Sequence, residues 1–280
     1  MTPAFRVGEA DRFRSGSWLE RSVDRLRRGQ TAAAPPMLRR AFEALLDWLP
    51  GDHLVSQLPD GERVRLSARY RHLSWNPDEY RAFRAAVRPG VTVLDVGANV
   101  GAYTLMFAMW VGEGGRVYAF EPAPDARAGL RTHVALNGLD ARVEIVESAM
   151  SSSAGSAPFA LHPSGGASSL SLSSVADAFH VVVDTDTIDN FCRTRALSPS
   201  VIKIDVEGSE LDVLKGARHT LALPGMHAFV EFHPAAWALA GIAPAEIEHE
   251  LREQGFVAEP LDPAYDPWAT EGVSVRLRRR

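Results

Sequence analysis

Short apolar runs alternate with amphipathic segments along the chain from residue 91 onward. Runs such as residues 93–96 and 201–204 are typical of strands that are buried on both faces of a parallel sheet. Alternation of strands and helices predicts an α/β fold with a doubly wound, mostly parallel sheet of seven strands. The predicted strands are 92–96, 116–120, 143–146, 201–204, 228–232, 256–259 and 273–277, and the predicted helices are 101–111, 125–136 and 209–221.

The first 88 residues follow a different pattern and form a predicted N-terminal extension. Residues 1–50 have helical apolar spacing, residues 53–58 and 63–70 flank a Pro-Asp-Gly turn as in a hairpin, and residues 76–87 predict a helix. We expect residues 1–88 to cover the substrate and residues 89–280 to form the cofactor-binding domain. Residues 148–174 are rich in Ser, Gly and Ala and predict an exposed loop or a weak hairpin.

Composition narrows the function classes. The 280 residues are 46% hydrophobic and 23% charged, with a net charge of -5, which disfavours a general nucleic-acid binder. Cys192 is the single cysteine, so an internal disulfide is excluded and a reducing cytoplasm is expected. No apolar run approaches the roughly 20 residues of a membrane helix, so no membrane partner is expected.

A glycine-containing loop, residues 95–101, follows the first predicted strand of the sheet and opens a helix. Ligands of doubly wound sheets bind at the carboxyl ends of the strands, which indicates a nucleotide-like cofactor here. Asn99 replaces the second glycine of a dinucleotide fingerprint, and Asp95 would repel phosphates. The loop therefore favours a cationic cofactor such as S-adenosylmethionine over a dinucleotide.

An acidic residue, Glu121, ends the second predicted strand just before Pro122. It follows the loop at about the 20-residue interval of ribose-binding folds, and a carboxylate accepts two hydroxyl hydrogen bonds well. We therefore predict that Glu121 holds a ribose.

Four segments together resemble the FkbM-type methyltransferases. They are residues 95–104 (Asp-Val-Gly-Ala-Asn-Val-Gly-Ala-Tyr-Thr), 118–122 (Tyr-Ala-Phe-Glu-Pro), 203–210 (Lys-Ile-Asp-Val-Glu-Gly-Ser-Glu) and 230–234 (Val-Glu-Phe-His-Pro). The resemblance implies a class I, Rossmann-like methyltransferase fold, S-adenosylmethionine as donor, and O-methylation of a hydroxyl on a sugar or secondary metabolite, as in natural product biosynthesis.

The resemblance also implies roles for individual residues. The loop would hold the methionine part of the cofactor, Glu121 the ribose, and Asp205 would face the sulfonium or the acceptor. Glu147 and Ser148 would lie near the adenine. The predicted cofactor-binding set is Asp95, Gly97, Ala98, Asn99, Gly101, Tyr103, Thr104, Glu121, Pro122, Glu147, Ser148 and Asp205.

Catalytic candidates lie at the ends of the fourth and fifth predicted strands. O-methylation needs an aligned acceptor and a base, and His233 is the first candidate base because histidine titrates near neutral pH. Asp205 is the runner-up. Glu231 is expected to pair with Lys203, because a buried ammonium needs a partner.

A divalent ion such as magnesium is a competing use of Asp205, Glu207, Glu231 and His233. Their spacing forms no recognised ligand motif, so no metal is expected.

The sequence defines the acceptor pocket less well than the cofactor site. It also does not determine the oligomeric state. Candidate lining residues are Trp75, Ser168, Ser169, Trp237, Tyr265 and Trp268. Two other functions stay open: a nicotinamide-dependent oxidoreductase on a related fold, and a non-catalytic binding protein that kept the cofactor fold.

Overall fold

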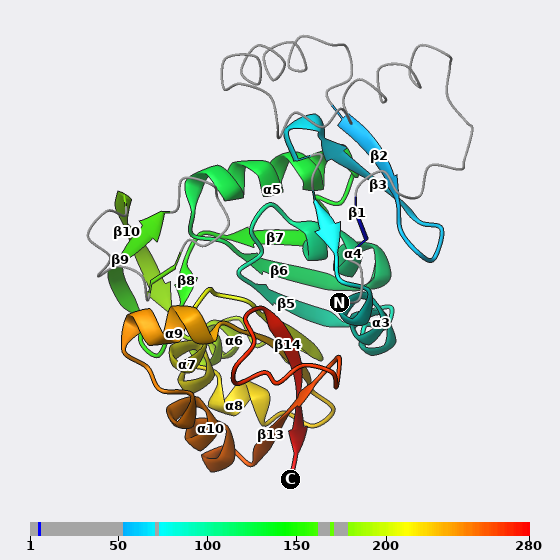
Figure 1. Ribbon diagram of the computed structural model, residues 1–280. Coiled ribbons are helices and arrows are strands. Elements are labelled where there is room, and N and C mark those ends of the chain that lie inside the picture. The colour runs from blue at the N-terminus through cyan, green and yellow to red at the C-terminus, as the bar shows by residue number, and fades with distance from the viewer. Residues whose placement is uncertain (1–4, 7–52, 71–72, 162–168, 171–178) are drawn as a thin grey trace, which may run out of the picture.

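The computed structural model describes residues 5–6, 53–70, 73–161, 169–170 and 179–280 (Figure 1). Most of the helical segment predicted over residues 1–50 lies outside the described residues.

A seven-stranded sheet forms the centre of the molecule, in the order β13-β14-β12-β11-β5-β6-β7. The pairs from β12 through β11, β5 and β6 to β7 are parallel, and β14 is antiparallel to both of its neighbours. The predicted doubly wound, mostly parallel sheet is therefore confirmed. Its strands are β5 (Thr92–Val96), β6 (Arg116–Phe120), β7 (Val143–Val146), β11 (Val201–Ile204), β12 (His227–Phe232), β13 (Phe256–Pro260) and β14 (Val273–Arg279).

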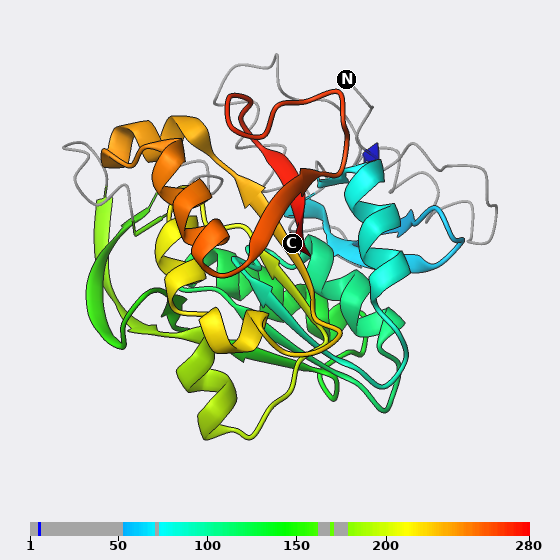
Figure 2. The same ribbon diagram turned by 90° about the horizontal axis from the view of Figure 1, so that it is seen from below.

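Helices cover both faces of this sheet, as the two views show (Figures 1 and 2). Val93, Val201 and Phe229 point to one face and pack with α3 (Pro77–Ala86), α4 (Ala102–Trp110) and α5 (Pro124–Leu136). Leu94 and Ile202 point to the other. That second face is covered by α6 (Ile188–Thr194), α7 (Glu210–Lys215), α8 (Arg218–Leu221), α9 (Pro234–Ala240) and α10 (Pro244–Glu253).

The predicted helix over residues 209–221 is two helices, α7 and α8, that meet at Gly216. A Cβ atom on Gly216 would lie 2.1 Å from the backbone oxygen of Ser151, so this junction has room only for glycine. Cys192 lies buried in α6, as its apolar spacing with Ile188 predicted.

A second, three-stranded sheet corrects the prediction of an exposed loop or weak hairpin for residues 148–174. Its order is β8 (Ala149–Met150), β10 (Phe179–Asp186), β9 (Gly155–Leu161). β9 pairs only with β10 among the described strands, so it is an edge strand. An edge strand tolerates Pro158 because part of its backbone needs no hydrogen-bond partner. Because of its small residues and this proline, the strand lacks the apolar pattern by which a strand is recognised in a sequence. Residues 162–168 and 171–174 of the segment lie outside the description.

The N-terminal extension packs directly on the sheet domain. β2 (His53–Gln57) and β3 (Arg63–Ser67) form the predicted hairpin, and a 3-10 turn (Ala68–Tyr70) follows. β1 (Phe5–Arg6) pairs with β4 (Ser74–Trp75), and Asn76 caps α3 by accepting from two backbone amides. Tyr80 and Phe83 of α3 belong to the same apolar core as Val93 and Leu105. The boundary at residue 88 therefore does not divide the core, and the division into two domains stays a prediction.

None of the described helices is both long and apolar enough to cross a membrane.

Candidate functional site

The loop between β5 and α4 turns through three residues with left-handed backbone, Gly97, Asn99 and Gly101. Asn99 adopts φ 50°, which asparagine tolerates better than most residues, and this explains how it replaces a glycine. The amides of Gly97 and Ala98 both donate to the carbonyl of Phe120 at 3.0 Å. The turn therefore ties the first strand of the sheet to its neighbour, at the edge where the predicted cofactor site lies.

Glu121 lies between this loop and the start of α5. One carboxylate oxygen accepts from the amide of Asn99 at 2.7 Å, and the other accepts from the amide of Ala123 at 2.8 Å. Burial outweighs these two hydrogen bonds and raises the pKa of Glu121 to about 7. Each oxygen keeps a lone pair for a further donor, which is what two neighbouring hydroxyls of a ligand require.

An open cavity of about 630 Å³, including the space at its mouth, runs along the carboxyl ends of β5, β6 and β11. Six of the predicted cofactor residues line it: Gly97, Asn99, Glu121, Pro122, Ser148 and Asp205. Its walls also include residues outside the predicted cofactor-binding set, namely Val96, Phe120, Ala123, Ala126, Ala149, Met150, Phe159, Leu170, Val206, Glu207 and Ser209. Four of these residues, Ala149, Met150, Phe159 and Leu170, come from the second sheet and its loop, which the sequence did not identify.

The other predicted cofactor residues do not line the cavity. Asp95 is fully buried and accepts from the hydroxyl of Thr104, so it supports the loop from below. Tyr103 donates to Glu79 on α3. The carboxylate of Glu147 pairs with Arg127 and Arg131 on α5, and its side chain is 59% exposed.

Ala98 and Gly101 likewise act through the backbone. Ala98 holds the turn by its amide, and Gly101 begins α4.

Lys203 is the buried cation beneath the cavity. It is 3% exposed, and its ammonium lies 2.9 Å from Asp205 Oδ2. This corrects the expected direct pairing with Glu231: the register sets Lys203 opposite Phe229, so Glu231 lies two residues further along β12, level with Asp205. Burial would lower the pKa of Lys203, but the charges of Asp205, Asp95, Glu231 and Glu79 outweigh it and raise that pKa.

Glu79 is a buried acid of α3 that the sequence did not reveal as part of this site. It accepts from the hydroxyls of Tyr103 and Ser274, which come from α4 and β14. Burial raises the pKa of Glu79 to about 7, against the opposing charge of Lys203. No local motif marks it, because its partners are distant in the sequence.

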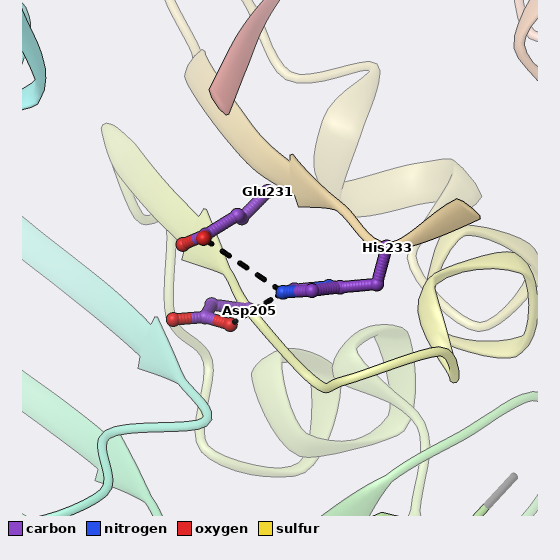
Figure 3. A group of neighbouring side chains, drawn as sticks. All are labelled: Asp205, Glu231 and His233. Carbon is purple, nitrogen blue, oxygen red and sulfur yellow. Dashed lines mark ion pairs between the residues drawn. The ribbon is translucent and has the colours of Figure 1, made fainter. Parts of the chain in front are cut away.

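His233 follows β12 and lies among four carboxylates. Its Nε2 is 3.7 Å from Asp205 Oδ1 and 3.7 Å from Glu231 Oε1 (Figure 3). The same Nε2 is 3.6 Å from Glu207 Oε2, and Nδ1 is 2.7 Å from Glu210 Oε1. Burial favours the neutral ring, but the hydrogen bond and charge of Glu210, with the charges of Asp205 and Glu231, raise the pKa of His233 to about 10. With that pKa the ring of the free protein holds its proton at neutral pH and cannot accept another. This argues against the base role predicted for His233.

The acids around the ring respond differently to burial. Burial opposes ionisation of Asp205, but Lys203 and His233 outweigh it and hold its pKa below the usual value. Burial and the charges of Asp205 and Glu79 raise the pKa of Glu231 well above the usual range. Burial raises the pKa of Glu207 to about 7, and Glu207 has a left-handed backbone, φ 50°, which is strained for a residue with a side chain.

Most of the predicted acceptor-pocket residues serve packing. Trp75 is buried and donates to the carbonyl of Ala102, and Trp237 is buried and donates to Glu210. Trp268 packs against Phe232 with ring centroids 5.1 Å apart. Ser169 is buried with its hydroxyl 3.1 Å from that of Ser209, which lines the cavity.

Tyr265 is half-buried and does not line the cavity. Ser168 lies outside the described residues.

Comparison with known proteins gives one family match, to the model of the methyltransferase FkbM domain, over residues 95–258. A methyltransferase of Sordaria araneosa, sdnD, is 27% identical over 67% of this chain and 81% of its own length. The hexuronic acid methyltransferase AglP of Haloferax volcanii is 27% identical over 68% of this chain and 74% of its own length. The 31-O-demethyl-FK506 methyltransferase FkbM of Streptomyces tacrolimicus is 39% identical over 41% of this chain and 42% of its own length.

Proposed function

The chain belongs to the family of FkbM-domain methyltransferases, and from this premise we propose that it methylates a hydroxyl group of a small molecule, a sugar or a secondary metabolite. Membership in this family makes S-adenosylmethionine the methyl donor and favours the methyltransferase over the oxidoreductase and the non-catalytic protein. The hydroxyl acceptor is supported by relatives whose names specify a hexuronic acid and 31-O-demethyl-FK506.

The observation that carries the proposal is the mixed lining of the cavity, which combines apolar side chains with carboxylates. Met150, Phe159 and Leu170 offer an apolar surface to a base, and Glu121 offers free lone pairs to ribose hydroxyls. Asp205 and Glu207 add negative charge to the lining, which would stabilise a sulfonium and an ammonium. The residues present therefore fit S-adenosylmethionine.

When bound, S-adenosylmethionine supplies an electrophilic methyl group on a positively charged sulfur. The chain must then align the acceptor oxygen with the methyl group and take up one proton. The acceptor loses its hydroxyl proton and gains the methyl group, and the electron pair of the broken carbon–sulfur bond stays on sulfur. The proton acceptor need not be a strong base, because the oxygen becomes strongly acidic as its bond to carbon forms.

We assign proton uptake to Glu207. Its carboxylate lines the cavity and is 30% exposed, so it reaches an acceptor, whereas His233 is 4% exposed and does not line the cavity. One oxygen of Asp205 is already engaged by Lys203. This assignment replaces the base role that the sequence suggested for His233.

Glu207→Gln tests the assignment. Loss of a general base typically lowers turnover by about 10²- to 10⁴-fold, while binding of S-adenosylhomocysteine should change little. Turnover is measured as methyl transfer from labelled S-adenosylmethionine to a panel of hydroxylated sugars and secondary metabolites. Glu259→Gln, on an exposed face of β13, is the matched control. Transfer by Glu207→Gln at the wild-type rate would contradict the role, and transfer only to nitrogen or carbon acceptors would contradict the proposed function.

A further inference from the structure

Three side chains at the ends of β11 and β12 converge on one point beside the cavity. Asp205, Glu231 and His233 each offer one ligand atom, and these three atoms lie within 4.8 Å of one another (Figure 3). The separations of 3.7 Å from His233 Nε2 to each carboxylate are too long for hydrogen bonds. They are close to the roughly 3 to 3.4 Å that separates two ligands of one ion with bonds of about 2.1 Å.

The ring of His233 supplies a second observation that points to a cation. Nδ1 faces Glu210, which as a carboxylate only accepts, so Nδ1 carries a hydrogen and Nε2 is the ring atom left for a metal ion, which would displace the proton that Nε2 holds in the free protein. The residue is 4% exposed, and within the described part of the chain its Nε2 has no hydrogen-bond partner. Three carboxylates therefore surround one ring nitrogen at distances beyond direct hydrogen bonds, an arrangement that a shared cation would hold together.

The residues around the cluster hold its ligand atoms in fixed orientations. Glu210 is fully buried and also accepts from Trp237 and from the amide of Gly208, so it fixes the histidine ring in one orientation. Carboxylates that hold the far nitrogen of a metal-bound histidine are common. Lys203 engages Asp205 Oδ2 and leaves Oδ1 directed at the cluster.

Acidic groups outnumber cations around the cluster. Asp205, Glu207, Glu210 and Glu231 surround the ring, and the described cations in contact with this group are Lys203 and the protonated ring itself. Lys203 is shared with two further buried acids, Asp95 and Glu79. A divalent ion in place of the ring proton would add positive charge where these acids converge.

We propose that Asp205, Glu231 and His233 bind a divalent transition-metal ion, of which Mn²⁺ is the expected type. An imidazole nitrogen with carboxylate oxygens suits Mn²⁺, Co²⁺ and Zn²⁺, whereas Mg²⁺ and Ca²⁺ prefer ligand sets made of oxygen alone. This differs from the expectation drawn from residue spacing, because the three ligands come together through parallel pairing of β11 with β12 and not through a local motif.

The position suggests a role that rests on the proposed function. Asp205 belongs both to the cluster and to the cavity wall, so an ion here would meet the acceptor hydroxyl beside Glu207. A divalent ion lowers the pKa of a bound hydroxyl, and the released proton would pass to Glu207.

The test measures metal binding by the full chain without cofactor or acceptor. Protein stripped with EDTA is titrated calorimetrically with Mn²⁺, and pulsed electron paramagnetic resonance reports whether a nitrogen coordinates the ion. We expect one ion per chain, a nitrogen coupling from imidazole, and affinity lowered at least about tenfold in Glu231→Gln and Asp205→Asn. Glu259→Gln should bind like the wild type.

Several results would overturn the site. They are a folded wild-type chain that binds none of Mn²⁺, Co²⁺ and Zn²⁺, binding of Mg²⁺ without Mn²⁺, a bound Mn²⁺ without nitrogen coupling, and binding that both variants leave unchanged. The nitrogen coupling is read on the wild type, so it decides the point even if a variant fails to fold. Binding of S-adenosylhomocysteine, measured separately, distinguishes failure of this site from failure of the proposed function.

Discussion

At the scale of single residues, buried charge dominates the site. Lys203 neutralises Asp205 directly and Asp95 through space, and its ammonium also lies 5.1 Å from the ring centroid of Tyr103. Such a cation is first a structural residue, because it is the close ion-pair partner of Asp205 and its charge also offsets those of Asp95, Glu79 and Glu231.

Lys203→Met should therefore destabilise the fold strongly. Removing one partner of a buried ion pair typically costs about 3–5 kcal/mol of unfolding free energy. Urea denaturation of the two proteins measures the difference, and Lys215→Met, which replaces an exposed lysine of α7, should cost little. Equal stability of Lys203→Met and wild type would show that the carboxylates do not need this cation.

The residues that the sequence identified lie next to strand ends. Glu121, Asp205 and His233 could be found because parallel strands bring their carboxyl ends to one edge. Glu79 and Glu210 could not, since Glu79 reaches the site through contacts with α4 and β14, and Glu210 through the packing of α7 against α9. The partner predicted for Lys203 was wrong for a related reason. Strand alternation gives the face of the sheet on which a side chain lies, but not the register between two strands.

At the scale of elements, the site depends on two loops that touch. A Cβ atom on Gly97, in the loop after β5, would lie 1.7 Å from the backbone oxygen of Asp205, in the loop after β11. No side-chain movement relieves a clash with backbone, so this position requires glycine for close approach as well as for its φ of 79°.

Gly97→Ala should abolish binding of S-adenosylhomocysteine and lower stability. The matched control is Gly138→Ala, because Gly138 also has a positive φ, 63°, but has open space where the Cβ atom would lie. The control should lose only about 1 kcal/mol of unfolding free energy to backbone strain and keep its affinity for S-adenosylhomocysteine. Calorimetric titration and thermal unfolding measure both effects; similar losses in the two variants would show that strain, not contact between the loops, is responsible.

The strands of the central sheet were predictable to within a residue or two at most ends, because burial on both faces leaves a continuous apolar run. The second sheet was not, because β9 is an edge strand with Gly155, Ser156 and Pro158 and lacks that signature. It supplies Phe159 to the cavity wall, so the missing element also concealed part of the candidate site.

At the scale of the whole molecule, one core continues across the predicted boundary at residue 88. Trp75, Tyr80 and Phe83 pack in the same cluster as Leu105 and Phe107, and Glu79 links α3 to the sheet through Ser274. The extension is thus part of the support of the site as well as its predicted cover.

A fragment of residues 89–280 should fail to fold by itself, because it would expose the face that these aromatic side chains cover. The full chain should unfold in one cooperative transition. Circular dichroism during thermal unfolding of both chains measures this. A fragment with a native-like, cooperative transition would establish residues 89–280 as an independent domain.

The central claim is that Glu121 and the cavity beside it bind S-adenosylmethionine, and titration calorimetry with S-adenosylhomocysteine tests it most directly. The ionised carboxylate accepts the ribose hydroxyls, and burial raises the pKa of Glu121 to about 7. Below that pH the free protein holds a proton there that opposes binding, so affinity should fall about tenfold between about pH 8 and about pH 6.

Glu121→Gln should bind much more weakly and lose that part of the pH dependence, while Glu259→Gln should match the wild type at both pH values. The difference between the wild-type and Glu121→Gln profiles removes the contribution of every other titrating group. Affinity that Glu121→Gln leaves unchanged, or a folded wild-type chain that does not bind S-adenosylhomocysteine, would contradict the account.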